Sequence, residues 1–133
     1  MRRAIEAIPV SELPVYMARF PAGACGDASY LLGAYLADCG EAGFQYVCGE
    51  RAAINANMWT SHAWLSRSGL VVDITADQFL DAPSAVIVER NSVWHGTFQV
   101  EDPPELGDFR AWLSGPGSDH LYELYPKLAA KLL

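Results

Sequence analysis

The sequence predicts an α+β fold in which a helix packs on an antiparallel sheet. Residues 25–39 carry apolar side chains at three- and four-residue steps, which is the period of a half-buried helix. Residues 43–100 hold several short strand-like segments, and residues 119–133 return to a helical pattern. Helices segregated from consecutive strands are typical of an α+β layer fold.

The N-terminal part is expected to be helical before a turn. Ser11 is a candidate N-cap for a short helix over SELPVYMARF, residues 11–20. Pro21 and Gly23 in FPAGAC then predict a turn that leads into the next element.

The central helix is predicted over residues 25–39. Asp27 lies in its first turn, where the helix dipole favours a negative charge, and Gly40 stands where a C′ residue belongs. The apolar positions of this helix are Ala28, Leu31, Leu32, Tyr35, Leu36 and Cys39. We expect a mostly buried helix.

Strands are predicted over residues 43–49, 85–90 and 92–100, in addition to two strands within 61–75. The connection over residues 50–59 is expected to be irregular. Its two asparagines, Asn55 and Asn57, are typical turn formers.

The C-terminal part is predicted to hold a short helix over DFRAWL, a break at SGPGS and a final helix over residues 119–133. Pro126 is expected to kink or interrupt this last helix. Its apolar stripe consists of Leu121, Leu124, Tyr125, Leu128 and Leu132.

Size and charge limit the classes of function. The 133 residues suit one domain, residues 1–133, and 51% hydrophobic residues favour a folded chain. A net charge of −7 argues against nucleic acid or an anionic membrane as the main partner. Three irregularly spaced cysteines and the lack of a signal-peptide pattern favour a reduced, cytoplasmic setting. The sequence does not indicate an oligomeric state.

The stretch SHAWLSRSGLVVDIT, residues 61–75, reads as a β-hairpin. With a turn centred on Arg67 and Ser68, the residue numbers of each facing pair add up to 135, so His62 is expected to face Asp73. A carboxylate that accepts a hydrogen bond from one imidazole nitrogen fixes the tautomer and leaves the other nitrogen free. A simple surface charge pair is the alternative interpretation.

Cys25 stands at the start of the predicted central helix, between small residues. A helix N-terminus stabilises a thiolate, and its N–H groups can hold a developing oxyanion. A cysteine nucleophile needs a base, and the base needs an orienting group. Cys25, His62 and Asp73 supply these parts, although a free cysteine is more often a small buried hydrophobe.

The motifs GACGDASYLL, HAW and DIT, in that order, resemble the papain-like cysteine hydrolase superfamily. In outline they are most similar to its transglutaminase-like and arylamine N-acetyltransferase-like branch. The longer run HAWL…GLVVDITADQF…VIVER…WHGTF is similar to a group of small bacterial proteins. The resemblance covers roughly residues 20–98 and implies a nucleophile helix packed on an antiparallel sheet.

The resemblance implies roles for three residues. Cys25 would be the nucleophile, His62 the general base and acid, and Asp73 the orienting group. The glutamine that precedes the nucleophile in papain-type enzymes is missing, since ARFPAGA stands there. A second oxyanion donor beside the Cys25 N–H is therefore not identified.

Other residues are candidates for the site wall. Trp64, Gln78 and Gly23 are candidate substrate contacts, and Gln78 is also a candidate donor to an oxyanion. Packing over His62 is the default for Trp64, and a backbone contact is the default for Gln78. Three roles are considered for His95. It lines the cleft, it serves as the base in place of His62 if the pairing of the two hairpin strands differs from the one predicted, or it makes a structural polar contact. For the remaining candidates we expect structural roles. Asp77 is predicted to cap a turn, His120 to lie on the surface, and Cys39 and Cys48 to lie in the core.

The leading expectation is a hydrolase or acyl transferase that acts on an amide or ester through a thioester. Its partner would be a peptide, protein or small molecule, without nucleic acid or membrane. No organic cofactor is implied, because GACG lacks the lysine of a phosphate-binding loop. The alternatives are a metal-binding protein that uses Cys25, His62, Asp73 and Cys48, and an inactive interaction or immunity domain.

Overall fold

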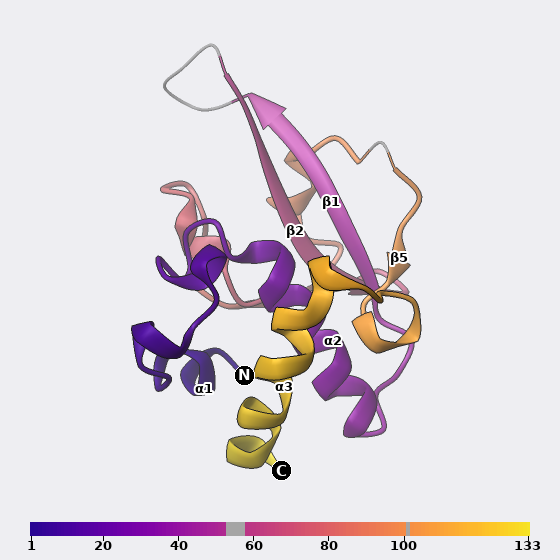
Figure 1. Cartoon of the computed structure of the whole chain (residues 1–133). Coiled ribbons are helices and arrows are strands. Elements are labelled where there is room, and N and C mark those ends of the chain that lie inside the picture. Colours follow the sequence, from indigo (N-terminus) through magenta and orange to yellow (C-terminus); the bar gives the residue numbers. More distant parts are fainter. Residues whose placement is uncertain (53–57, 101) are drawn as a thin grey trace.

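The computed structural model describes residues 1–52, 58–100 and 102–133 (Figure 1). Its described helices are α1 (Arg2–Glu6), α2 (Cys25–Asp38) and α3 (Asp119–Leu132). Its described strands are β1 (Gln45–Ala52), β2 (Trp59–Arg67), β3 (Leu70–Asp73), β4 (Ile87–Arg90) and β5 (Glu105–Leu106). Within the described ranges, no helix combines the length and apolarity that crossing a bilayer requires.

The strands form one antiparallel sheet in the order β4-β3-β2-β1-β5. Helix α2 packs against β2 and β1, and α3 packs against α1 and α2 (Figure 1). The predicted α+β architecture with an antiparallel sheet is therefore confirmed. The start of α2 lies near His62 and Ala63 of β2, the central strand of the sheet.

Helix α2 has the predicted boundaries. Gly40 adopts φ +86°, and its N–H donates to the Ala37 carbonyl at 3.0 Å, while the Glu41 N–H donates to the Leu36 carbonyl at 2.8 Å. This pair of bonds is a Schellman motif, which glycine favours because the left-handed backbone meets no Cβ penalty. The end of α2 is thus encoded locally.

A close backbone contact sets the position of α2 against the chain that follows β5. A Cβ on Gly33 would lie 2.3 Å from the Gly107 carbonyl oxygen. A Cβ on Gly107 would lie 2.6 Å from the Leu65 side chain. Only glycine at both positions allows this approach.

The β2–β3 turn lies one residue later than predicted. Ser68 and Gly69 both have positive φ, at 50° and 82°, as a two-residue hairpin turn requires. Leu65 faces Val72, so facing residues sum to 137 rather than 135. His62 is therefore not directly opposite Asp73 as expected, but the shift of two keeps both on one face of the sheet.

The predicted helix over residues 11–20 is wrong. Two short 3₁₀ turns, Val10–Glu12 and Val15–Met17, stand there instead. Pro14 separates them, because a proline disfavours helical backbone in the preceding residue and lacks an N–H donor. Tyr16 is 70% exposed, contrary to an apolar helix face.

Strand predictions elsewhere are partly wrong. Residues 92–100 form a 3₁₀ turn at His95–Thr97, and Gln99 alone bridges to Glu50 of β1. β1 continues to Ala52, three residues beyond its expected end. The predicted turn residues Asn55 and Asn57 lie outside the described residues.

Two cysteines expected in the core are exposed. Cys39 follows the last residue of α2, and Cys48 lies on β1 with its side chain open to solvent. All three cysteines are free thiols. Cys25 is half-buried, so its environment differs from that of the other two.

The C-terminal helix matches its prediction, and most of its apolar stripe is buried. α3 continues through Pro126 without a break, contrary to the expected interruption. The expected DFRAWL helix is a 3₁₀ turn, Phe109–Ala111. The buried residues of α3 are Leu121, Leu124, Tyr125 and Leu128, which join the main core with α1 and α2.

Candidate active site

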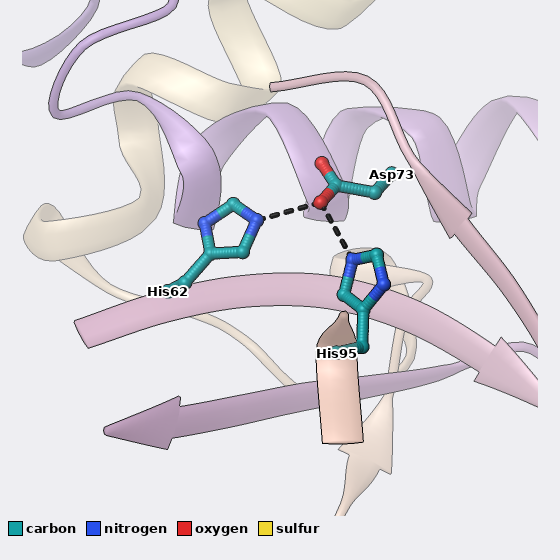
Figure 2. A group of neighbouring side chains, drawn as sticks. All are labelled: His62, Asp73 and His95. Atoms are coloured by element: carbon teal, nitrogen blue, oxygen red, sulfur yellow. Dashed lines mark hydrogen bonds and ion pairs between the residues drawn. The ribbon is translucent and has the colours of Figure 1, made fainter. Parts of the chain in front are cut away.

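His62 and Asp73 form a buried hydrogen bond at the centre of the sheet (Figure 2). His62 Nε2 lies 2.6 Å from Asp73 Oδ2, and the two residues are 0% and 2% exposed. Because a carboxylate only accepts, His62 Nε2 carries the proton and donates. The imidazole therefore turns its other nitrogen, Nδ1, away from Asp73.

The Asp73 carboxylate accepts hydrogen bonds on both oxygens. Oδ1 accepts from the Thr75 backbone N–H at 2.8 Å, and Oδ2 accepts a second imidazole bond from His95 Nε2 at 2.8 Å. Burial raises the pKa of Asp73, but hydrogen bonds from His62 and His95 outweigh burial and hold the pKa at about 2. Asp73 is an anion over the whole physiological range.

The same contacts act on His62 in the opposite sense. Burial lowers the pKa of His62, whereas hydrogen bonding to Asp73 and then to Cys25 raises it, with a net pKa of about 9. A protonated imidazole is therefore favoured at neutral pH when its two acidic neighbours are anions.

Aromatic rings hold the His62 imidazole in one orientation. Its ring centroid lies 5.0 Å from that of Phe79, 5.7 Å from Trp94 and 5.6 Å from Phe98. The Arg51 guanidinium covers this group from outside, with Cζ 4.4 Å from the Phe98 centroid. The aromatic group excludes water from His62 on this side.

Cys25 is the first residue of α2 and lies beside His62. Because these residues form the start of α2, the N–H groups of Cys25, Gly26 and Asp27 have no acceptor within the helix. Burial raises the pKa of the Cys25 thiol, but interaction with His62, then hydrogen bonds from the Ala63 backbone and the Gln78 side chain, lower it below its usual value overall. Since Asp73 occupies Nε2 of His62, Nδ1 is the nitrogen left for interaction with the thiol.

Gln78 contacts the free side of His62. Its Nε2 lies 3.1 Å from His62 Nδ1 and donates to the Thr75 carbonyl at 3.2 Å. The amide donates to Nδ1 only while that nitrogen is unprotonated; once Nδ1 carries a proton, the thiolate of Cys25 is the acceptor in reach. Gln78 therefore lies at the site, and its predicted contact with substrate stays a prediction.

An N-terminal anchor fixes the segment that carries Gln78. Arg2 of α1 donates to both carboxylate oxygens of Asp77, at 2.7 and 2.8 Å, and to the Ile74 carbonyl at 3.0 Å. Asp77, expected to cap a turn, thus pairs with a residue that is 75 positions away in the sequence. The anchor holds the 3₁₀ turn Ala76–Gln78 against α1.

His95 makes a structural polar contact, which was one of the roles considered from the sequence, but its partners were not predicted. Its Nε2 donates to Asp73, and its Nδ1 lies 2.7 Å from Ser92 Oγ. Both ring nitrogens are therefore occupied, which makes His95 unsuited to act as the base. The Ser92-x-x-His95 spacing was the available signal, but a predicted strand placed these two side chains on opposite faces.

His62, Asp73 and His95 form a group whose ligand atoms lie within 4.8 Å of one another. Their N–O separations of 2.6 and 2.8 Å are hydrogen-bond lengths. Ligands about 2.0 Å from a tetrahedral zinc stand roughly 3.3 Å apart. The arrangement fits a protonated network better than a metal centre, and the group does not contain Cys25, which the metal alternative used together with His62 and Asp73.

The remaining predicted residues lie around this network. Trp64 is 4% exposed and packs beside His62 and His95, with ring centroids 5.8 and 4.9 Å away. Gly23 has φ +71° in the turn before α2. Their expected substrate contacts stay predictions.

His120, expected at the surface, is partly buried. Its Nε2 lies 2.9 Å from Asp27 Oδ2, which links α3 to the first turn of α2. The contact holds the start of α3 against the first turn of α2.

Comparisons with protein-family models, with curated proteins and with solved structures found no match. The chemistry of this site therefore follows from its own residues.

Proposed function

We propose that this protein is a cysteine-nucleophile hydrolase or acyl transferase that acts on an amide or ester, with a papain-like or transglutaminase-like core. One observation carries the proposal: the half-buried thiol at the start of α2 has a lowered pKa beside an imidazole that Asp73 holds in place. A lowered thiol pKa and an oriented base are the features that activate a cysteine nucleophile.

In the proposed reaction, the Cys25 thiolate attacks the carbonyl carbon of the substrate. The tetrahedral intermediate collapses to a thioester, and protonated His62 gives its Nδ1 proton to the departing amine or alcohol. Neutral His62 then takes a proton from water or from an acceptor amine, which attacks the thioester. The products are a free acid or a transferred acyl group, and the thiolate is restored.

Asp73 keeps the His62 imidazole in one orientation throughout this cycle. Its anionic oxygen accepts from His62 Nε2 throughout, so the imidazole presents Nδ1 to the thiol in every step. The depressed pKa of Asp73, about 2, means that it takes no proton from His62.

The oxyanion requires at least two donors. The backbone N–H of Cys25, at the start of α2, supplies one. The Gln78 amide is the second donor in this proposal, because it interacts with both the Cys25 thiol and His62. It would replace the glutamine that papain-type enzymes carry before the nucleophile.

The proposal is tested with p-nitrophenyl esters and the protein in which Cys39 and Cys48 are both replaced by serine. These substitutions remove the two exposed thiols and leave Cys25. We expect one equivalent of p-nitrophenol in a burst and one acyl group on Cys25 by mass spectrometry. Addition of Cys25→Ser should remove both signals, and a burst that survives this change would contradict the proposal.

A further inference from the structure

We infer that His95, held by Ser92, is a positioning residue that fixes the Asp73 carboxylate and thereby sets the reactivity of Cys25. The inference rests on the proposed function. It extends the site along one continuous hydrogen-bonded chain, from Ser92 through His95 and Asp73 to His62.

Asp73 Oδ2 is shared between two imidazoles (Figure 2). His62 and His95 both aim Nε2 at this one oxygen, at 2.6 and 2.8 Å. Thr75 holds the other oxygen. With donors from three directions, the carboxylate cannot rotate about its Cβ–Cγ bond without loss of at least one bond.

His95 is itself held rigidly. Ser92 Oγ lies 2.7 Å from Nδ1 and also accepts the His95 backbone N–H at 3.4 Å. The His95 ring centroid lies 4.8 Å from Trp94 and 4.9 Å from Trp64. His95 is 4% exposed, so it does not reach a substrate and acts through Asp73 alone.

The direction of the effect follows from the shared oxygen. The hydrogen bond from His95 lowers the pKa of Asp73, so its loss raises that pKa and leaves Oδ2 held only by His62. A less ordered carboxylate orients His62 less well. The thiolate of Cys25 then loses part of its stabilisation, and its pKa rises.

The test measures the alkylation of Cys25 by iodoacetamide against pH, in the protein without Cys39 and Cys48. His95→Phe keeps a ring but removes the donor, whereas His95→Gln keeps an N–H donor at similar reach. In metal sites, loss of the partner that holds a ligand in place typically lowers metal affinity or activity 10- to 100-fold, and we take the lower end as the scale here. We therefore expect His95→Phe to slow alkylation at pH 6 by about tenfold and raise the midpoint by about one pH unit.

His95→Gln is the matched control, and it should restore a profile close to that of the parent. A general packing defect would instead affect both variants alike. If the His95→Phe profile coincides with the parent profile and the parent midpoint is low, the inference fails while the proposed function stands. If the parent midpoint is already that of an ordinary thiol, the proposed function fails.

A measurement on the unmodified protein covers the case in which His95→Phe does not fold. Long-range ¹H–¹⁵N correlation spectra report which imidazole nitrogens carry protons. The inference requires protons on Nε2 of both His62 and His95 at neutral pH. A His95 with unprotonated Nε2 cannot donate to Asp73 and would overturn the inference.

Discussion

His62 and Asp73 meet diagonally across the β2–β3 hairpin, with 2.6 Å between Nε2 and Oδ2. Leu65 faces Val72, so in this register the position directly opposite His62 is two residues beyond Asp73. Diagonal side chains on one face lie within reach when one of them is long. The bond therefore depends on the two-residue turn at Ser68 and Gly69, which sets the register.

Asp73→Asn should destabilise the protein by about 3–5 kcal/mol, because it breaks a buried charged pair and mismatches two imidazole donors. Urea unfolding of the variant and the parent gives this difference. Glu12→Gln is the control, since the side chains of Glu12 and its partner Lys127 are 54% and 53% exposed and such pairs contribute about 0–1 kcal/mol. Equal losses in the two variants would contradict the buried network.

The free energy of unfolding should fall as pH drops below about 4, whereas His62 and Cys25 act in opposite senses as pH rises towards 9. The pKa of Asp73 falls from 3.8 to about 2 on folding, so its stabilisation is present above pH 3.8 and is lost as pH falls towards 2. The pKa of His62 rises from 6.5 to about 9 on folding, but the pKa of Cys25 is lowered from 9.0, so the proton that His62 retains is offset by the proton that Cys25 releases. Urea titrations across this range measure both effects.

Cys25→Ser separates the contributions of His62 and Cys25. Without the titrating thiol, the free energy of unfolding should decline as pH rises above 6.5, because Asp73 still raises the pKa of His62. Identical alkaline profiles of the parent and the variant would contradict the pairing of Cys25 with His62.

Gly33→Ala should destabilise the protein by about 1–3 kcal/mol or prevent folding, because its Cβ would lie 2.3 Å from the Gly107 carbonyl oxygen. Gly117→Ala is the control, since its Cβ would meet nothing within 4 Å. Thermal unfolding of both variants checks the contrast. A Gly33→Ala protein as stable as the control would show that α2 can move away from Gly107.

Gln78→Leu should slow acylation of Cys25 by a p-nitrophenyl ester by about 100-fold or more, as loss of an oxyanion donor does. Alkylation by iodoacetamide forms no oxyanion, so it should change much less. The ratio of the two rates is the readout. Equal reductions in both rates would remove Gln78 from the oxyanion role and leave it as a neighbour of the thiol.

Local signals made part of this structure predictable. The α2 boundaries follow from apolar spacing and from Gly40, whose left-handed backbone needs no tertiary partner. The turn was predicted one residue too early, but His62 and Asp73 were still placed on the same face of the sheet. Moving the turn by one residue shifts the strand pairing by two positions, and side chains alternate between faces with a period of two.

Long-range packing made the rest unpredictable. His95 reaches Asp73 because residues 92–97 form a turn rather than a strand, and the Ser92-x-x-His95 spacing alone was too weak a signal to separate the two. The contacts of Arg2 with Asp77 and of Asp27 with His120 join distant parts of the chain. Such pairs follow from tertiary structure rather than from sequence spacing.

The pH dependence of Cys25 alkylation, with and without His62, tests the central claim most directly. The protein without Cys39 and Cys48 gives the parent profile, and His62→Ala is added to it. We predict a parent midpoint below the pH of about 8.5 that is typical of a free thiol, and a rise when His62 is lost. A midpoint near 8.5 that is the same in both proteins would contradict the account.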